Sequence, residues 1–511
     1  MFRNLCLIIL IALAGLTGCS APDSSDTLSI SGPFEPISLD PARSGYIFSR
    51  MQVIETLVDI DNKGQLKPGL ATRWEHSKDN QVWTFYLRPN VVFHDQSAMN
   101  ADAVVNSLNI AFRKPAPYPQ DLVEAVTAIN DSTVQITLSR PYRPFASLMT
   151  NYTTVILSPA SYSESQEITK LSGTGPYQVE EFQPPHRVGV TKFHNYWGEP
   201  AHVSKVVYTT GHRAETRALM VASGQTDIVY NLDAASVDLL KVTKKAKVDS
   251  TLIPRTILIK VNASYPALAD VKVRQALSLA IDRQGIASKI LRVENIEANQ
   301  LFGPSMGVWH DANLPPAEQD VERAHALLNE AGWLQDGSGI RHKNGSPLKL
   351  NMITYANRAE LIVIATALQN QWAQIGVDLR VHMENASAIP SGHADGTLQL
   401  ALMARNFANI PDPLGIMLAD FTSTEGGDWG PMGWQNPAVF SALSALPLVQ
   451  DKKAYASQVQ NIMHQINADL PVIPVVFYMQ QSAVTPRVEN FSFDPYERSF
   501  RLSDITLKPA S

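Results

Sequence analysis

The chain has 511 residues, of which 42 are Lys or Arg and 48 are Asp or Glu, so its formal net charge is −6. The apolar fraction of 45% is ordinary for a globular protein and argues against a disordered, collagen-like or polytopic membrane chain. The mildly acidic balance gives no electrostatic reason to bind nucleic acid, and two cysteines are too few for a disulfide framework or a thiolate metal cluster.

The N-terminus has the pattern of a secretory signal. Arg3 precedes an apolar run over residues 5–14, which is shorter than the roughly 20 residues of a transmembrane helix. Leu16-Thr17-Gly18-Cys19 resembles a bacterial lipobox, which implies cleavage before Cys19 and lipid attachment to this cysteine. The alternative is a plain secretory signal with a chance cysteine.

This interpretation divides the start of the chain into two segments. Residues 1–18 are expected to be a lipoprotein signal peptide, and the small polar residues 19–27 a tether. The mature protein would then be anchored to a membrane through Cys19 and face the periplasm or the cell surface.

Beyond the tether, strand-like and helix-like segments alternate, which predicts an α/β protein. Alternation of side-chain character predicts strands over residues 82–87, 133–138 and 377–381. Helical spacing predicts helices over residues 104–108 (capped near Asn100), 274–281, 322–331 and 361–375, the last two ending at Gly332 and Gly376.

Catalytic signatures are missing from the sequence. It has no His-Glu-x-x-His, Gly-x-Ser-x-Gly or Walker-type motif, and its 12 histidines are scattered. Residues 173–176, Gly-Thr-Gly-Pro, indicate a turn rather than a phosphate loop, because no lysine follows and proline lacks an N–H. A catalytic site assembled in space stays open at this point.

An ordered series of short motifs resembles the peptide/nickel-type solute-binding proteins of ABC importers, the bacterial extracellular solute-binding family 5. The series consists of Leu66–Trp74, Trp83–Asp95, Ala101–Val104, Gly173–Tyr177, Asn195–Gly198, Arg217–Leu219, Gly224–Asp227, Val273–Leu277, Ala280–Arg283, Ala326–Leu328, Ala331–Trp333 and Ile375–Val377. Most of these residues, Trp74, Trp83, Phe85 and Trp333 among them, are expected to belong to the scaffold.

The resemblance implies a two-lobed, periplasmic-binding-protein-like fold of type II with an interlobe ligand cleft. Lobe 1 is expected over residues 28–260 plus 480–511, with an extra subdomain at about 61–170, and lobe 2 over 261–479. The implied partners are an ABC permease and its ATPase, and a monomer without enzymatic activity is expected. A cell-surface hydrolase and a peptide-sensing co-receptor without transport are the alternatives.

The segment 402–413 carries the strongest implications for the ligand. Peptide-binding members commonly place an aspartate for the peptide's α-ammonium where this chain has Asn409. The nickel and metallophore branch has an arginine and an aromatic residue at the positions of Arg405 and Phe407, and a second arginine that matches Arg113. Guanidinium groups favour carboxylates, so a small peptide, an opine-like molecule or a carboxylate-rich metal chelate is the expected ligand.

Three further positions complete the expected ligand site. Tyr152 occupies the place of another ligand-facing arginine of that branch, and Tyr46 lies in a segment that lines the cleft of many members. Glu425 falls near a histidine of the nickel binders and is a possible metal ligand. No cofactor is expected, and a metal only as part of the transported chelate. The structural alternatives are a lobe-to-lobe salt bridge for Arg405, a solvated helix end for Arg113 and core packing for Tyr46.

Overall fold

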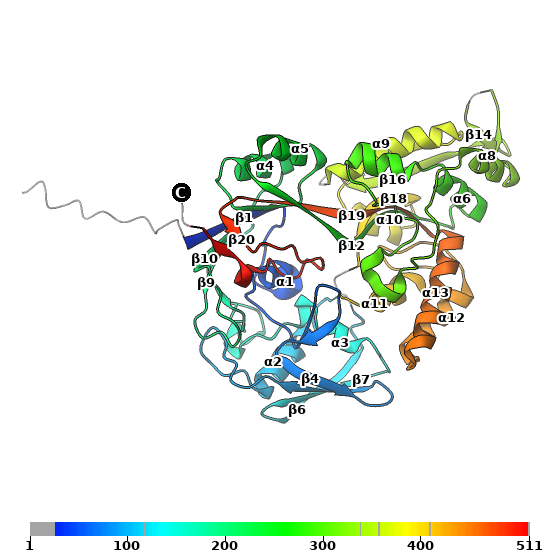
Figure 1. Ribbon diagram of the computed structural model, residues 1–511. Helices are drawn as coiled ribbons and strands as arrows, with labels where there is room; N and C mark the ends of the chain where they lie inside the picture. The colour runs from blue at the N-terminus through cyan, green and yellow to red at the C-terminus, as the bar shows by residue number, and fades with distance from the viewer. Residues whose placement is uncertain (1–25, 117, 338, 356–357, 408–409, 509–511) are drawn as a thin grey trace, which may run out of the picture.

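The computed structural model describes residues 26–508 except 117, 338, 356–357 and 408–409. The predicted signal peptide, Cys19 and Asn409 lie outside the described residues. The chain forms two α/β halves connected by the long strands β12 (Lys247–Val261) and β19 (Val472–Val484) (Figure 1). The predicted lobe boundaries at residues 260 and 480 fall within these two strands.

One twisted sheet runs through both halves. Its strand order is β17 (Asp378–Glu384), β16 (Lys349–Tyr355), β18 (Leu400–Asn406), β12, β19, β11 (Ile228–Tyr230), β1 (Thr27–Gly32), β10 (Lys205–Thr210), β9 (Arg187–Lys192) and β8 (Tyr177–Gln183). Pairing is parallel at β1–β10, β1–β11, β16–β17 and β16–β18, and antiparallel at the other neighbours.

The pairing of β12 with β19 is interrupted where the chain passes from one half to the other. Leu252 pairs with Met479, but the next pair is Thr256 with Phe477, so β12 bulges outward over residues 253–255. Pro254 lies in this bulge and has no N–H to donate to a ladder. The regular pairing of the two strands is therefore interrupted between the two halves.

The other elements cover this sheet or form smaller sheets. The smaller sheets are β4 (Ala71–His76), β5 (Val82–Leu87), β7 (Thr133–Leu138) and β6 (Val123–Asn130); β2 (Val58–Ile60) and β3 (Leu66–Pro68); β13 (Leu334–Gln335), β14 (Arg341–Lys343) and β15 (Ser346–Pro347); and β20 (Val488–Glu489) and β21 (Thr506–Leu507). The helices are α1 (Pro41–Arg50), α2 (Ala101–Ala111), α3 (Phe145–Leu148), α4 (Ala214–Ala222), α5 (Ala234–Thr243), α6 (Val271–Leu279), α7 (Arg283–Gly285), α8 (Val321–Glu330), α9 (Ala359–Gln374), α10 (Ala388–Ala394), α11 (Leu414–Phe421), α12 (Pro437–Ala445) and α13 (Lys452–Asp469), with short η2 (Tyr152–Thr154), η3 (Pro159–Ser161), η4 (Ile286–Leu291), η5 (Pro304–Trp309), η6 (Leu446–Leu448) and η7 (Leu502–Asp504).

The predicted elements are confirmed; the strands at 82–87 and 133–138 have the predicted boundaries, and those of the others are shifted by one to three residues. Asn100 caps α2 by accepting a hydrogen bond from the N–H of Ala103 at 3.0 Å. Gly332 and Gly376, just after α8 and α9, have φ of 82° and 80°, a left-handed conformation that glycine adopts without strain. The predicted strands correspond to β5, β7 and β17.

The apolar side chains collect into separate cores. One cluster takes its residues from 257–476, a second from 57–156 together with Ile410, and a third mainly from α1, the strands β1, β8–β11 and the C-terminal segment. Trp83, Phe85 and Trp333 are buried in these clusters, as expected. Each half therefore has its own core, which allows the halves to move as bodies.

The two halves also touch on the side of α1. Ile410, which precedes α11, packs into the core of the β4–β7 subdomain. The Arg143 guanidinium of this subdomain lies over the ring of Tyr455 on α13, 4.2 Å from its centroid. The structure thus holds the halves together on this side of the crossing strands.

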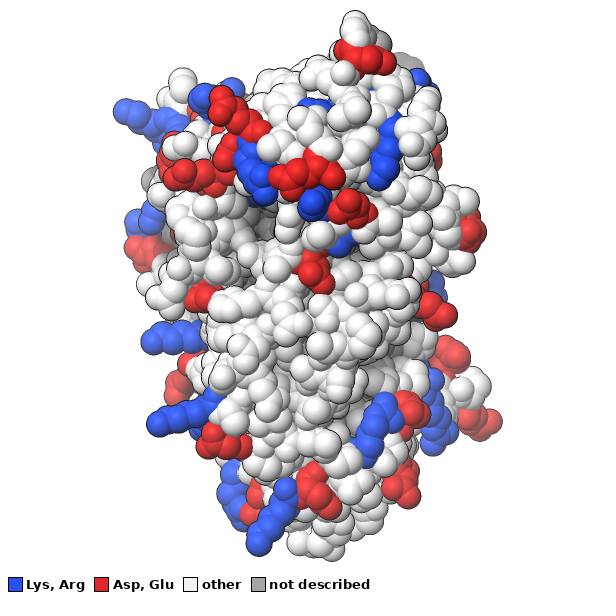
Figure 2. Space-filling model, turned by 90° about the vertical axis from the view of Figure 1, so that its right-hand side faces the viewer, with Lys and Arg blue, Asp and Glu red and all other residues white. Residues whose placement is uncertain are grey.

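On the face that Figure 2 shows, neither positive nor negative side chains form a large patch of one sign. Lysine, arginine, aspartate and glutamate side chains mix at its upper and lower ends, and its middle is largely uncharged. No helix within the described residues is long and apolar enough to cross a membrane.

Candidate functional site

A cavity of about 230 Å³ lies where the two halves meet, next to α1. It is lined by Phe34, Tyr46, Ser49, Arg50, Thr150, Tyr152, Asn406, Tyr496, Glu497 and Arg498. Asn406 ends β18 of the second half, while the other residues come from the first half and the C-terminal segment. We call this space the cleft cavity.

Helix α1 places its side chains at the cleft cavity because its start is fixed. Asp40 caps the helix by accepting a hydrogen bond from the N–H of Ala42 at 3.0 Å, and its other oxygen pairs with Lys114 at 2.6 Å. Pro41 occupies the first turn, where no N–H is needed. Ser44, with φ of −138° and ψ of 19°, then kinks the helix between this capped turn and the part that carries Tyr46 and Arg50.

Aromatic rings form one wall of the cavity. Tyr46 meets Phe34 and Tyr152 edge to face, with centroids 6.0 and 6.3 Å apart, and its hydroxyl donates to the carbonyl of Glu35 at 2.7 Å. A Cβ at Gly45 would lie 2.7 Å from Cδ2 of Tyr152, so this approach requires glycine. The structure therefore brings together two of the predicted ligand residues, Tyr46 and Tyr152.

The polar part of the lining includes Arg50 and Glu497, and Glu497 is shared with a second buried arginine, Arg255, which does not itself line the cavity. Oε2 of Glu497 lies 2.7 Å from Nη2 of Arg255, and Oε1 lies 3.5 Å from Nη2 of Arg50. Nε of Arg50 also donates a hydrogen bond to the backbone carbonyl of Glu497 at 2.7 Å. Arg50 and Arg255 are only 7% and 6% exposed. The Arg50 guanidinium also lies 4.1 Å from the Phe34 centroid.

This group carries more positive than negative charge and more donors than acceptors. Burial works to raise the pKa of Glu497, but Arg255, Arg50 and Arg358 outweigh it and hold that pKa below its ordinary value. Within the described residues, Nη1 of Arg50 and both Nε and Nη1 of Arg255 are buried without a hydrogen-bond partner. Of the two arginines, Arg50 lines the cavity, and its charge and unpartnered donor favour an anionic ligand that can accept a hydrogen bond.

Of the other predicted ligand residues, the four that the structure describes, Arg113, Arg405, Phe407 and Glu425, do not line the cleft cavity. Nη2 of Arg405 pairs with Oδ2 of Asp420 at 2.8 Å, and both residues belong to the second half, so the bridge does not join the lobes. Burial raises the pKa of Asp420, although Arg405 acts in the opposite direction. Phe407 is buried against Phe302, with centroids 4.7 Å apart.

The two remaining described positions are exposed. Arg113 follows α2, and its Nη1 donates a hydrogen bond to Oε1 of Gln166 at 3.5 Å. Glu425 lies in the exposed segment after α11. In the described part of the chain, no group of three or more His, Cys, Asp or Glu side chains is placed to hold a metal ion.

A second, more polar cavity of about 520 Å³ adjoins the cleft cavity and shares Ser49, Thr150 and Arg498 with it. Glu55 lies in its wall and accepts hydrogen bonds from Thr174 at 2.7 Å, Trp197 at 2.9 Å and Tyr196 at 3.0 Å. Burial raises the pKa of Glu55 to about 7 despite these three donors.

The raised pKa of Glu55 predicts a pH-dependent stability. Between pH 4.5 and 7 the carboxyl ionises in the unfolded chain but stays protonated in the folded one, so the free energy of unfolding falls as the pH rises, by about 3 kcal/mol for this group, and levels off above pH 7. Glu55→Gln should remove this pH-dependent part of the free energy of unfolding. At pH 8 the variant should therefore be more stable than the native chain. Urea denaturation at pH 4.5 and pH 8 measures it.

The matched control is Glu164→Gln, because Glu164 is exposed. If the free energy of unfolding depended on pH in the same way in Glu55→Gln and Glu164→Gln, the proposed titration of Glu55 would be refuted.

Two α/β halves, two crossing strands and a cavity between the halves define a two-lobed solute-binding protein. The chain belongs to the bacterial extracellular solute-binding proteins, family 5, whose model matches residues 65–428. Members of this family act as substrate-binding proteins of ABC importers, which favours a transport receptor over the hydrolase and co-receptor alternatives.

Individual relatives and structures agree with this membership. The chain is 24% identical to the nickel-binding periplasmic protein of Escherichia coli over 513 residues, 96% of each chain. It is 27% identical to the dipeptide-binding protein of the same organism over 343 residues, 61% of this chain and 62% of that one. The crystal structure of NikA from Brucella suis in complex with Fe(III)-EDTA superposes with a TM-score of 0.88 at 21% identity, covering 94% of this chain and 100% of that one.

Several residues of the cleft cavity were missed by sequence reasoning. Arg50 has a local signal, because it lies four residues after Tyr46 and therefore on the same face of α1. Glu497 and Arg255 have no local signal, since they are separated by more than two hundred residues and meet only through the fold.

Proposed function

We propose that this protein is the extracytoplasmic receptor of an ABC importer and captures a carboxylate-bearing small molecule, a short peptide or a metal chelate, in the cleft cavity. The supporting observation is the buried Arg50–Glu497–Arg255 group, in which three guanidinium nitrogens have no hydrogen-bond partner within the described residues. A ligand carboxylate in the cavity beside Glu497 would accept a hydrogen bond from Arg50, which lines the cavity, and balance the second positive charge of the group.

The cavity walls suit a ligand with both polar and flat parts. The rings of Phe34, Tyr46 and Tyr152 provide an apolar surface, and Arg50, whose guanidinium lies against the Phe34 ring, adds a positive charge beside it. A cavity with apolar walls and a few polar groups fixes a ligand's orientation while excluding water. The relatives that bind nickel or dipeptides, and the neighbour bound to Fe(III)-EDTA, a polycarboxylate chelate, support the same ligand class.

The proposal includes a route for delivery. Lobe closure traps the ligand, and the closed receptor docks on a permease driven by its ATPase. The lipobox-like residues 16–19 support an anchor at Cys19, which keeps the receptor near that permease. We expect a monomer in the periplasm or at the cell surface.

Thermal denaturation in the presence of candidate ligands tests the ligand class. Dipeptides and nickel–histidine complexes should be compared with dipeptide amides, which lack the terminal carboxylate. A carboxylate ligand at about 100 times its Kd should stabilise the folded protein by about 2.7 kcal/mol and raise its Tm. Equal stabilisation by acids and amides would contradict the assignment of a carboxylate ligand.

A further inference from the structure

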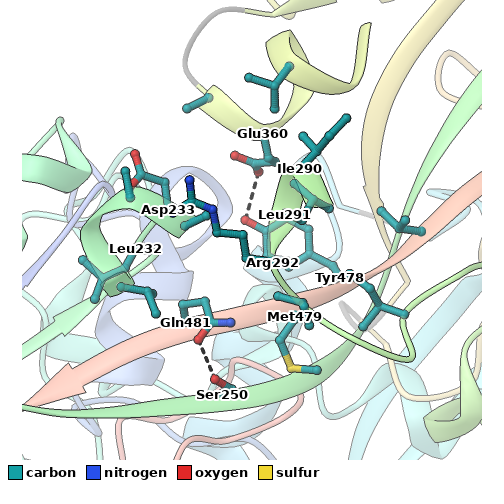
Figure 3. A pocket seen from close by; sticks show the side chains of 18 of the residues that line it. Leu232, Asp233, Ser250, Ile290, Leu291, Arg292, Glu360, Tyr478, Met479 and Gln481 are labelled. Carbon is teal, nitrogen blue, oxygen red and sulfur yellow. Dashed lines mark hydrogen bonds between the residues drawn. The ribbon is translucent and has the colours of Figure 1, made fainter. Parts of the chain in front are cut away.

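A separate cavity of about 470 Å³ lies against β12 and β19, behind the hinge (Figure 3). In Figure 1, α1 lies below these strands, whereas α5 and α9 lie above them. Helix α5 and the preceding loop form one wall, η4 with the following loop and α9 form the other, and β19 forms the floor. We call this space the hinge cavity.

Both halves of the protein contribute to the hinge cavity, so its width depends on how they are placed relative to each other. Arg292, directly after η4, forms an ion pair with Asp238 on α5 and connects the two walls. Figure 3 shows the side chains of Arg292 and Glu360 entering the space above Tyr478 and Met479. The cavity is therefore a gap between the halves rather than a pocket within one of them.

The lining has an apolar part and an acidic surplus. The apolar side chains are Leu232, Val237, Ile257, Ile290, Leu291, Val293, Ile296, Val363, Val476, Phe477 and Met479. Among the charged side chains, Asp238 pairs with Arg292 and Glu360 with Arg358, which leaves two carboxylates, Asp233 and Glu294, against one basic group, Lys241. Charge complementarity and the apolar walls fit a small organic cation with an apolar body.

A chain of buried contacts connects this cavity with the cleft. Arg255, which pairs with Glu497 at the cleft cavity, lies over the ring of Tyr478, 4.9 Å from its centroid. The Tyr478 hydroxyl donates to Oε1 of Glu360 at 3.0 Å and accepts from Nη1 of Arg358 at 3.1 Å. Arg255 lies in the bulge of β12 and Tyr478 opposite it on β19, so these contacts pass through the hinge itself.

We propose that the hinge cavity is a second binding site, which takes a small organic ammonium compound with an apolar body and thereby favours the closed cleft. The direction follows from the geometry. The halves touch at Ile410 and Arg143 on the cleft side while the hinge cavity is open behind them. Rotation that opens the cleft brings α5 toward α9, so an occupant between them resists opening.

Calorimetric titration with a matched pair of probes tests the site and its charge preference. Tryptammonium and indole-3-propionate share an apolar body and differ in the sign of their charge. We expect saturable binding of tryptammonium and at least about tenfold weaker binding of indole-3-propionate. Absence of tryptammonium binding, or equal binding of both probes, would overturn the proposal.

Two variants locate the binding. Val363→Trp on α9 places an indole in the hinge cavity at a side chain that is 45% exposed, and should weaken tryptammonium binding at least about tenfold. Val242→Trp on α5 is the control, because Val242 is 81% exposed and does not line the cavity. If Val363→Trp binds tryptammonium as the native chain does, the site lies elsewhere and the proposal fails.

A distance measurement tests the coupling independently of any cleft ligand. The sequence has no cysteine after Cys19, so Glu124→Cys on β6 and Lys452→Cys on α13 can carry spin labels on the two sides of the Arg143–Tyr455 contact. Tryptammonium should shift the distance distribution toward its shorter component, and this shift should be lost with Val363→Trp. An unchanged or longer distance at saturation would refute the coupling. Neither measurement depends on the carboxylate ligand proposed for the cleft.

Discussion

Glu497→Gln is expected to lower the free energy of unfolding by about 3–5 kcal/mol, because it removes the carboxylate shared by two buried arginines. Arg50 and Arg255 would keep their charges in a nearly inaccessible site, with desolvation no longer offset by a carboxylate. The amide oxygen accepts one of their hydrogen bonds but supplies no negative charge. Urea denaturation at neutral pH measures the change.

The control for Glu497→Gln is Glu489→Gln. Glu489 also pairs with a basic residue, Lys508, at 3.3 Å, but both side chains are about half exposed. Such an exposed pair contributes at most about 1 kcal/mol. If the two variants lost the same stability, Glu497 would not be the electrostatic centre of the cleft that the geometry indicates.

Arg50→Met should weaken binding of a carboxylate ligand by about 100-fold, equivalent to roughly 2–3 kcal/mol, and affect the corresponding amide far less. Methionine retains much of the side chain's apolar length against Phe34 but removes the charge and the unpartnered donor nitrogen. Calorimetric titration of the acid and its amide measures the difference.

The control for this experiment is Arg43→Met, which removes an exposed arginine from the same helix. The ratio of acid to amide affinity separates loss of recognition from general destabilisation, because destabilisation affects both ligands. An unchanged ratio in Arg50→Met would show that Arg50 does not recognise the carboxylate.

Local sequence predicted much of the fold because local chemistry determines it. Asn100 before α2, and Gly332 and Gly376 after α8 and α9, act through caps and backbone conformations that involve only neighbouring residues. The bulge at residues 253–255 depends on the pairing of β12 with β19, more than two hundred residues away, and has no comparable local signal beyond Pro254.

Two residues that line the cleft cavity, Tyr46 and Tyr152, were predicted, both from the family resemblance. Arg50 follows Tyr46 on the same helix face. Arg405 shows the limit of this reasoning, because the sequence does not reveal that Asp420, fifteen residues later, lies within 2.8 Å and pairs with it. Likewise, nothing near residue 497 indicates that this glutamate joins Arg50 and Arg255.

Native mass spectrometry of the protein purified from its own host tests most directly whether the cleft captures a carboxylate-bearing solute. The native protein is expected to retain a small molecule whose released mass and fragmentation show at least one carboxylate, with or without a metal ion. Arg50→Met purified in the same way should retain little of it, and Arg43→Met should retain it fully. A retained ligand without a carboxylate, or one held equally by Arg50→Met, would contradict the account.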